Sequence, residues 1–363
     1  MYKSGVFKGL IMKKGLILLE KLYKENYLDD TGLKYLVDNY DQELLEISRE
    51  YAVKTATKNF NKNIYYRGII EFSNICRNDC FYCGLRKSNY NVNRYRLNED
   101  EILKSCEIGY QMGIRTFVLQ GGEDIQFDEK ISALIKEIKY KYSDCAITLS
   151  LGERSYSTYK TWYDMGASRF LLRHETADKL HYEKLHPPYQ EYRNRMRSLD
   201  DLKTIGYQSG AGMMVGSPYQ TNNTITKDLM FLRDYKAEMV GIGPFIPHKQ
   251  TPFKNEEIGD FNLSLYLLAL TRLLLPQSLI PATTAMDTVK KDGRLDAILS
   301  GCNVIMVNIT PMKERKNYKL YNDMAELRSF NNIDMDSLNK KLKKIGYSII
   351  IDKGDFFEYE KGE

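Results

Sequence analysis

The sequence predicts an α/β protein whose main body is a (β/α)8 barrel of the TIM type, with a helical extension before it and a short α/β segment after it. Between residues 67 and 330, eight short apolar runs alternate with amphipathic stretches, which is the pattern of parallel βαβ units. That span is close to the ~250 residues that such barrels take. A doubly wound open sheet is the alternative, and the number of runs favours the barrel.

Polar residues at the ends of these runs also favour the barrel. They are Glu123, Glu153, Arg173, Glu175, Thr283, Thr284, Asn308 and Thr310. The C-terminal ends of barrel strands meet at one mouth, where active sites are built. Loops also begin with polar residues, so a single position carries no argument, whereas the set does.

We expect three parts, the first of which is a helical extension over residues 1–66. Leucines at helical spacing and the segment "DQELLEISREYAVKTATKNF" predict helices over residues 16–62, with Thr31 as an N-cap. The lysine-interrupted start "GVFKGLIMKKGLILLEKLY" is interpreted as the lead-in to a helix, not a signal peptide. Met12 is an alternative start to Met1.

The second part is the barrel over residues 67–330. The expected strands are "GIIEFSN", "RTFVLQGG", "CAITLSLGE", "SRFLLRHE", "QSGAGMMVG", "EMVGIGPF", "LIPATTAM" and "CNVIMVNIT". Gly113, Gly166 and Gly206 end helix-like stretches just before a strand, as helix C-caps do. The third part, residues 331–363, reads as a helix, a short strand and a charged end that caps the barrel.

Composition limits the classes of function. The net charge is +5, and the 53 basic and 48 acidic residues are interleaved, so no stripe suited to a phosphate backbone forms and nucleic acid is not expected as a partner. No run approaches the ~20 apolar residues of a membrane span. Six cysteines in 363 residues, with no secretory signal, indicate a reducing cytoplasm, where grouped thiols bind metal more often than they form disulfides.

Three of the six cysteines lie in "SNICRNDCFYCGLRK", at Cys76, Cys80 and Cys83, directly after the first expected strand. A structural zinc site normally has four Cys or His ligands, and all four histidines are far along the chain. Cysteines at such short spacings hold iron–sulfur clusters, and three thiolates leave one iron of a 4Fe-4S cluster without a protein ligand. The solitary Cys106, Cys145 and Cys302 are expected to be buried apolar residues.

The CxxxCxΦC pattern, with the aromatic Tyr82 before the third cysteine, resembles the radical S-adenosylmethionine (SAM) superfamily. The resemblance implies that the open iron binds SAM, and that an electron from the cluster cleaves it to methionine and a 5′-deoxyadenosyl radical. In "VLQGGED", Gly121, Gly122 and Glu123 resemble the GGE motif that meets the SAM amino group. An ordinary turn is the alternative interpretation of these three residues.

Further residues of the expected mouth are assigned by the same resemblance. Glu175 is a candidate for the SAM ribose hydroxyls or the substrate, and Arg195 for the SAM carboxylate, because a guanidinium holds a carboxylate by two parallel bonds. Met214 and Met239 are candidates to face the adenosine, with core packing as the alternative. A strand-end salt bridge is the alternative for Arg173 and Glu175, and an exposed surface position is the alternative for Arg195.

The strings "EFSNICRNDCFYCGLR", "SLGE", "LLRHETA", "MVGIGPFIPH" and "IPATTAM" together resemble the HydE family, maturases of iron–iron (FeFe) hydrogenase related to biotin synthase and methylornithine synthase. The resemblance implies an iron–cysteine substrate bearing CO and cyanide, the partner maturases HydG and HydF, and a low-potential electron donor. Arg173, Thr283, Thr284 and Tyr318 are the candidate substrate residues.

Two departures and two rival functions accompany this resemblance. Some HydE proteins carry a second cluster, but no cysteine follows Cys302, so we expect one cluster only. "LQGGED" also differs by one residue from the family form "SGED". The rivals are a methylornithine-synthase-like mutase or another radical SAM enzyme acting on an amino-acid-like substrate, and a zinc-stabilised barrel that binds a partner or a metabolite.

Overall fold

The computed structural model describes residues 2–322 and 335–356, and its centre is a barrel of eight parallel strands. The strands follow the order β6-β5-β4-β3-β2-β1-β8-β7. Between β6 and β7 the ring is closed by two backbone bonds, from the Val240 N–H to the Leu279 carbonyl (3.1 Å) and from the Leu279 N–H to the Glu238 carbonyl (2.8 Å). The predicted fold class is confirmed. The strands are β1 (Asn63–Ser73), β2 (Thr116–Gly121), β3 (Ala146–Ser150), β4 (Arg169–Leu171), β5 (Gln208–Val215), β6 (Met239–Pro244), β7 (Pro281–Ala282) and β8 (Val304–Asn308).

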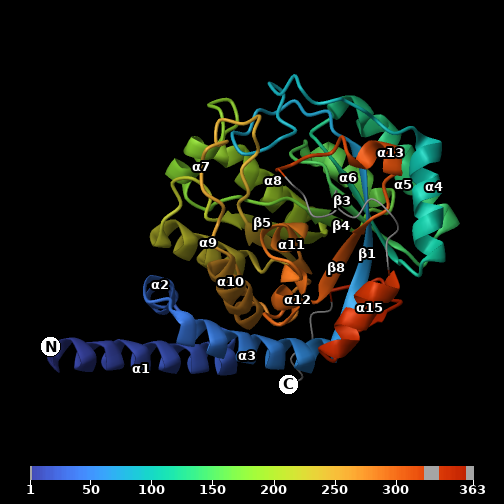
Figure 1. Cartoon of the computed structure of the whole chain (residues 1–363). Helices are drawn as coiled ribbons and strands as arrows, with labels where there is room; N and C mark the ends of the chain where they lie inside the picture. Colours follow the sequence, from blue (N-terminus) through green and yellow to red (C-terminus); the bar gives the residue numbers. More distant parts are fainter. Residues whose placement is uncertain (1, 323–334, 357–363) are drawn as a thin grey trace.

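Helices follow the strands and cover the outside of the barrel (Figure 1). They are α4 (Glu99–Gln111), α5 (Asp128–Lys141), α6 (Tyr156–Asp164), α7 (Lys179–Leu185), α8 (Tyr192–Ile205), α9 (Asn222–Tyr235), α10 (Phe261–Leu274), α11 (Thr284–Val289), α12 (Gly293–Ile298) and α13 (Met312–Arg315). The predicted C-cap glycines all have positive φ, at +85° for Gly113, +113° for Gly166 and +102° for Gly206. Glycine adopts this left-handed backbone without steric penalty.

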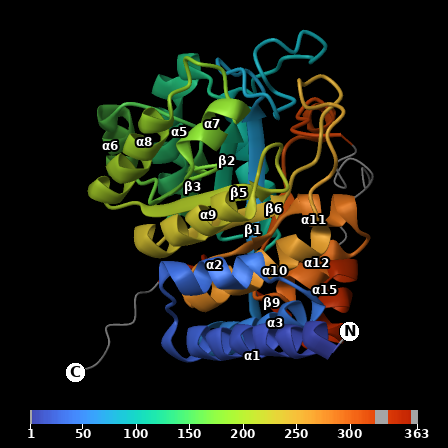
Figure 2. The same cartoon turned by 90° about the vertical axis from the view of Figure 1, so that its left-hand side faces the viewer.

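The N-terminal extension forms a helical layer under the barrel, at the end away from the strand C-termini (Figure 2). It consists of α1 (Tyr2–Glu25), α2 (Asp30–Asp38) and α3 (Gln42–Phe60). Helix α10 lies on this layer, where the buried Tyr266 hydroxyl donates to the Leu36 carbonyl at 3.1 Å. The N-cap of α2 is Asp29, which accepts from the Gly32 N–H at 2.8 Å, so the prediction of Thr31 as the cap was wrong. Thr31 instead donates its hydroxyl to Asp29.

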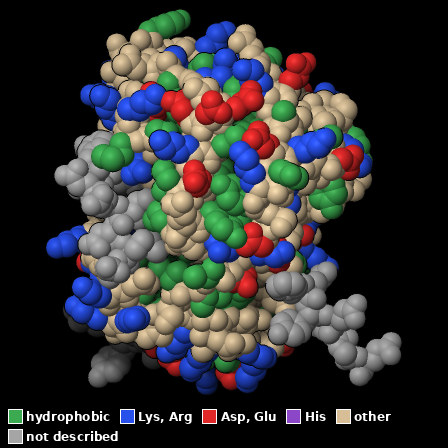
Figure 3. All heavy atoms as spheres, turned by 90° about the vertical axis from the view of Figure 1, so that its right-hand side faces the viewer, with side chains coloured by type: hydrophobic (Ala, Val, Ile, Leu, Met, Phe, Trp, Pro, Cys, Tyr) green, Lys and Arg blue, Asp and Glu red, His purple; other side chains and the backbone are tan. Residues whose placement is uncertain are grey.

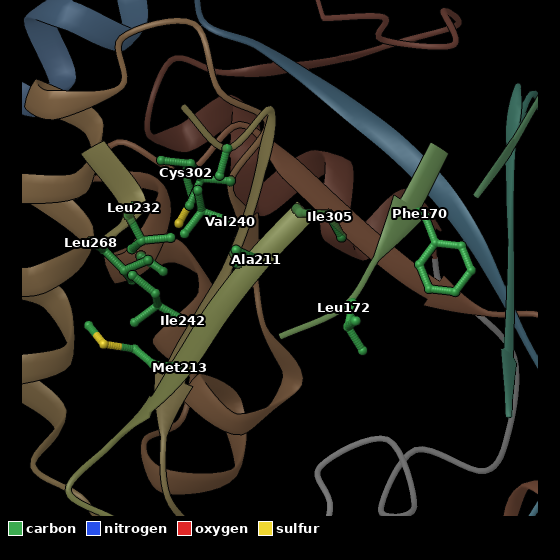
Figure 4. Close-up of a cluster of buried hydrophobic side chains, with 14 of the residues drawn as sticks. Phe170, Leu172, Ala211, Met213, Leu232, Val240, Ile242, Leu268, Cys302 and Ile305 are labelled. Atoms are coloured by element: carbon green, nitrogen blue, oxygen red, sulfur yellow. The ribbon is translucent and has the colours of Figure 1, made fainter. Parts of the chain in front are cut away.

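The hydrophobic core lies between the strands and the covering helices. Figure 4 shows Val240 and Ile242 of β6 meeting Leu232 of α9 and Leu268 of α10. These side chains belong to one large buried cluster, which also contains the three barrel residues Phe170, Ala211 and Met213. Cys106, Cys145 and Cys302 are buried in the same cluster, which confirms the expectation for the solitary cysteines.

The C-terminal segment closes the floor of the barrel. Helix α15 (Met335–Lys344) leads to β9 (Ser348–Ile350), which pairs in parallel with the start of β1. Beyond β9, the buried Arg169 donates to the Lys353 carbonyl at 2.9 Å and forms an ion pair of 2.6 Å with Asp355. The predicted helix and short strand are thus present, while residues 331–334 and 357–363 lie outside the described residues. Over the described residues, no helix is long and apolar enough to cross a membrane.

Candidate active site

The three predicted cluster cysteines lie on one loop at the mouth of the barrel. Strand β1 ends at Ser73 and the loop carries Cys76, Cys80 and Cys83, all three as free thiols. Burial and then neighbouring Cys76 raise the pKa of Cys83 to about 12, and Glu175 adds to this rise. Burial, followed by Cys83 and Cys76, also raises the pKa of Cys80 well above its usual value. The thiols are thus close to one another and are protonated at neutral pH until a metal displaces the protons.

Ionic and carbonyl contacts fix the shape of this loop. The Arg94 guanidinium donates to four backbone carbonyls, those of Asn74 (2.5 Å), Leu85 (2.9 Å), Arg86 (2.7 Å) and Asn89 (3.2 Å). Inside the loop, Asp79 accepts from Arg86 at 2.7 Å and from Ser88 at 2.6 Å. The loop therefore keeps its shape through its own side chains.

The segment after α13 covers the loop. The Gly84 N–H donates to the Leu320 carbonyl at 2.8 Å, and the Asn74 side chain donates to the Asn317 carbonyl at 2.7 Å. A Cβ at position 84 would lie 2.2 Å from the Lys319 carbonyl oxygen, so only glycine allows this contact. Tyr318 is buried between the two segments, which brings this predicted substrate residue to the mouth.

The GGE segment meets the cysteine loop from β2. A Cβ at Gly122 would lie 2.2 Å from the Ile75 carbonyl oxygen and 2.8 Å from Cys76 Cβ. The next residue, Glu123, donates its backbone N–H to Cys76 Sγ at 3.4 Å. Its carboxylate accepts from Arg77 Nε and from the Glu153 N–H, both at 3.0 Å. Gly122 is thus required by a close backbone approach, and Glu123 joins the cysteine loop to the end of β3.

Arg173 and Glu175 lie inside the mouth, after β4. Glu175 Oε1 accepts from Arg173 Nε at 3.1 Å, whereas the buried Oε2 has no hydrogen-bond partner among the described residues. The backbone of Glu175 is left-handed, at φ +64°, although the residue is not glycine. Strained backbone at such a position is typical of functional sites. An unpaired buried carboxylate oxygen is costly unless a ligand supplies a donor.

The Arg173 side chain is partly open to solvent inside the mouth. The Arg173 side chain is 36% exposed although it lies within the ring of strands, against β6. A Cβ at Gly241 on β6 would meet nothing closer than Arg173 Cδ at 3.7 Å. Thr283 follows β7 and lies against the same strand, because a Cβ at Gly243 would lie 2.6 Å from its Oγ1. This Oγ1 is buried with no partner among the described residues. Thr284, the next residue, is the first residue of α11. Of the predicted strand "LIPATTAM", only Pro281 and Ala282 form β7.

Arg195 is buried at the start of α8 and faces the mouth. Its Nε donates to Glu153 Oε1 at 2.7 Å, and its NH1 donates to the Arg173 carbonyl at 2.7 Å. The interpretation of Arg195 as an exposed surface arginine is therefore wrong. Glu153 contacts both residues, because its carboxylate accepts from Arg195 and its backbone N–H donates to Glu123. Arg195 of α8 and Glu123 of the GGE segment therefore belong to one hydrogen-bond network.

An aromatic and apolar wall stands beside the cysteines. Tyr82 and Phe81 pack against a buried cluster of Met214, Leu185, Phe245 and Phe253. His186 Nδ1 lies 2.9 Å from the Tyr182 carbonyl and must donate to it, so Nε2 accepts from the Tyr82 hydroxyl at 3.2 Å. Burial, together with Arg195, lowers the pKa of His186 to about 3, which keeps the imidazole neutral. Met214 thus reaches the predicted site.

Met239 does not reach the mouth. It is the first residue of β6, and its sulfur accepts from the buried Arg67 at 3.4 Å. It packs with Leu279 and Val304 at the floor, next to the C-terminal segment. Met239 is therefore a core packing residue, which was the alternative interpretation, and we exclude Met239 from the cofactor site.

Several residues at the mouth were missed by sequence analysis. Gln190 Nε2 donates to Cys80 Sγ at 3.3 Å, and its Oε1 accepts from the Asp79 N–H at 3.3 Å. Glu71 on β1 is buried and accepts from Asn308 at 2.8 Å. A charged residue inside the apolar run "IIEFSN" is a visible signal for Glu71, whereas the sequence around Gln190 gives none.

These residues fit the two groups that the sequence predicts. In the described part of the chain, no three His, Cys, Asp or Glu side chains converge closely enough to hold a single metal ion. A structural zinc ion needs such convergence, whereas in an iron–sulfur cluster the thiolates bind different irons. The unpaired Glu175 Oε2 offers an acceptor, and the partly exposed Arg173 guanidinium offers donors, for a polar ligand near the thiols.

Comparison with known proteins agrees with this geometry. Residues 70–232 match the model of the radical SAM superfamily. The chain is 45% identical over 308 residues to the [FeFe] hydrogenase maturase subunit HydE of Thermotoga maritima, an alignment that covers 85% of this chain and 87% of that protein. It is 26% identical to the 3-methylornithine synthase of Methanosarcina acetivorans over 90% of this chain and 92% of that one.

A solved structure shares the fold. The crystal structure of methylornithine synthase superposes with a TM-score of 0.81 at 24% identity, covering 92% of this chain and 97% of that one. Membership of the superfamily implies a 4Fe-4S cluster and SAM as cofactors. The chain belongs to the radical SAM superfamily and, within it, to the HydE family.

Proposed function

We propose that this protein matures [FeFe] hydrogenase in the cytoplasm, using one 4Fe-4S cluster held by Cys76, Cys80 and Cys83. The observation that carries the proposal is the three-thiol loop at the mouth of the barrel, in a chain 45% identical to a HydE protein. A 4Fe-4S cluster held by these three thiolates would supply the electron for the reductive cleavage of SAM. The protein binds and orients SAM and substrate and excludes bulk water.

We assign the SAM contacts to residues around the cysteine loop. Gly121 and Gly122 offer close-approaching backbone, and Glu123 and Arg195 offer charges for the amino and carboxylate groups of SAM. Both charges are held in place through Glu153. Glu175 Oε2 is placed to accept from the ribose hydroxyls, with Tyr82 and Met214 as the adjoining apolar wall. Because these side chains are already held in position, they lose less conformational entropy when SAM binds.

We assign the substrate contacts to residues that follow β4 and β7 and to Tyr318. Arg173 offers a cation, and Thr283 and Thr284 offer hydroxyls at the end of β7. The buried Tyr318 closes the mouth between β1 and the segment after α13. A cation with nearby hydroxyls suits an anionic substrate, such as the iron–cysteine complex with CO and cyanide expected from HydG. The product would then pass to HydF.

A complementation assay tests the function. We expect the gene to restore hydrogenase activity to a strain that lacks its own HydE, and the Cys83→Ala gene to fail. Cleavage of SAM to 5′-deoxyadenosine by the purified protein, without complementation and with turnover of an amino-acid-like substrate, would instead identify a mutase of the methylornithine synthase type. A zinc-loaded protein that forms no cluster on anaerobic reconstitution would exclude radical chemistry altogether.

We expect Gln190 to tune the cluster. Its N–H bond to the Cys80 sulfur stabilises negative charge on that ligand, and hydrogen bonds to cluster sulfurs raise the reduction potential. Replacing Gln190 with leucine should lower the potential by about 20–60 mV, the equivalent of one hydrogen bond. Redox titration followed by EPR measures it. The Gln250→Leu variant, which loses a bond to Asn91 on a neighbouring loop, should keep the parent potential; equal potentials in both variants would remove this role from Gln190.

A further inference from the structure

Four cationic side chains surround the cysteine loop at the surface. We call Lys87, Arg94, Lys249 and Lys319 the cationic rim, and all four are exposed. No ion pair between the described residues involves a member of the rim. The acidic residue inside the loop, Asp79, is already paired with Arg86. The rim therefore presents positive charge that the chain itself leaves uncompensated.

The rim lies directly over the cysteines. The Lys87 N–H donates to the Asn78 carbonyl at 2.7 Å, between Cys76 and Cys80. The Arg94 guanidinium donates to four carbonyls of the loop, as described above. Both residues are therefore attached to the loop that carries the three thiols.

Lys249 and Lys319 reach the cysteines through one buried histidine. His248 is only 4% exposed, and its Nε2 would lie 2.9 Å from a Cβ at Gly84, the neighbour of Cys83. Lys249 follows His248 directly, and a Cβ at Gly84 would also lie 2.2 Å from the Lys319 carbonyl oxygen. His248 and the Lys319 backbone thus pack against the residue that follows the third cysteine.

The views of the molecule agree with this placement. The loop that carries the cysteines stands at the top of the barrel in Figures 1 and 2, and the loop near residue 250 reaches the same end. In Figure 3, Lys and Arg side chains gather along this top edge, and Asp and Glu form a band below them. The helical layer α1–α3 is at the opposite end.

We propose that the cationic rim is the docking surface for an acidic one-electron carrier protein that reduces the cluster. This inference rests on the proposed function, which requires one electron per SAM cleaved. In the step, the carrier's reduced centre loses one electron and the cluster gains it, with no bond made or broken. A carrier with an acidic surface is steered by the rim and is held where His248 and Gly84 separate it from Cys83.

The test is the rate of cluster reduction by a pre-reduced acidic flavodoxin, followed anaerobically in a stopped-flow spectrophotometer. The test protein carries Lys87→Glu, Lys249→Glu and Lys319→Glu. The control protein has the same change in net charge at exposed, unpaired lysines elsewhere, with Lys13→Glu, Lys58→Glu and Lys136→Glu. At low ionic strength we expect a five- to tenfold slower second-order rate for the test protein and a control within twofold of the parent. The difference should vanish at high salt.

A small reductant, titanium(III) citrate, separates the two hypotheses. If titanium(III) citrate reduces all three proteins and all three cleave SAM, the proposed chemistry stands. Equal reduction rates with flavodoxin would then contradict the proposal that the rim is the docking surface. If the parent itself forms no reducible cluster, the proposed function fails. A test protein that loses affinity for RNA but keeps the parent rate with flavodoxin also overturns the proposal, because the rim would then serve a nucleic acid.

Discussion

The Cys80→Ala variant is expected to lose the cluster and at least a thousandfold of SAM cleavage. Cys80 is one of three thiols on the loop, and the other three cysteines are buried in the hydrophobic core, so none of them can replace it. Two thiolates cannot retain a cluster that already has one open iron, so both the iron content and the charge-transfer absorbance near 400 nm should disappear. Anaerobic reconstitution, iron analysis and assay of 5′-deoxyadenosine measure the loss.

The control for this variant is Cys106→Ala. Cys106 is fully buried on α4, away from the loop, and behaves as a small apolar residue. The change should cost about 1 kcal/mol of stability through the small cavity it leaves, with normal iron content and activity. A Cys80→Ala protein that retained a cluster and cleaved SAM at the parent rate would remove Cys80 from the ligand set.

The Glu175→Gln variant is expected to weaken SAM binding ten- to a hundredfold. Oε1 is occupied by Arg173, while the buried Oε2 lacks a partner among the described residues and is free to accept from the ligand. Hydrogen bonds to charged groups contribute about 1.5–3 kcal/mol, and about 1.4 kcal/mol corresponds to a factor of ten. Calorimetry with the reconstituted, oxidised protein measures the dissociation constant without turnover.

A matched control separates ligand binding from folding. Glu183 on α7 is exposed, with a 3.7 Å contact to Lys179, so the Glu183→Gln variant should bind SAM as the parent does. Thermal melting shows whether each variant folds. A folded Glu175→Gln protein with the parent affinity for SAM would assign Glu175 to the ion pair with Arg173 instead, which was the alternative interpretation of the sequence.

The sequence predicts the barrel well because its signals are periodic and local. Apolar runs and glycine C-caps mark the strands and helix ends, and the three cysteines follow a strand directly, so their place at the mouth follows from the fold. The α2 cap was misassigned because Asp29 and Thr31 are both competent caps two residues apart. The strand predicted at 279–286 is shorter than expected, since α11 begins at Thr284.

The site is less predictable where it depends on distant loops. Gln190 meets Cys80 across 110 residues of chain, in a segment without hydrophobic periodicity. Met239 was assigned to the adenosine by type, although its place at the start of a run already pointed to the floor, whereas Met214 near the end of its run points to the mouth. Position within a strand decides which end of a barrel a residue serves.

The cover over the cysteine loop has a consequence for synthesis of the protein. Asn74 and Asn317, which join the loop to its cover, are 243 residues apart in the chain. A ribosome adds about 5–20 residues per second, so the thiols emerge some ten to fifty seconds before the segment that closes over them. During this interval the three thiols are open to iron, and equally to oxidants, on a nascent chain that has yet to complete its barrel.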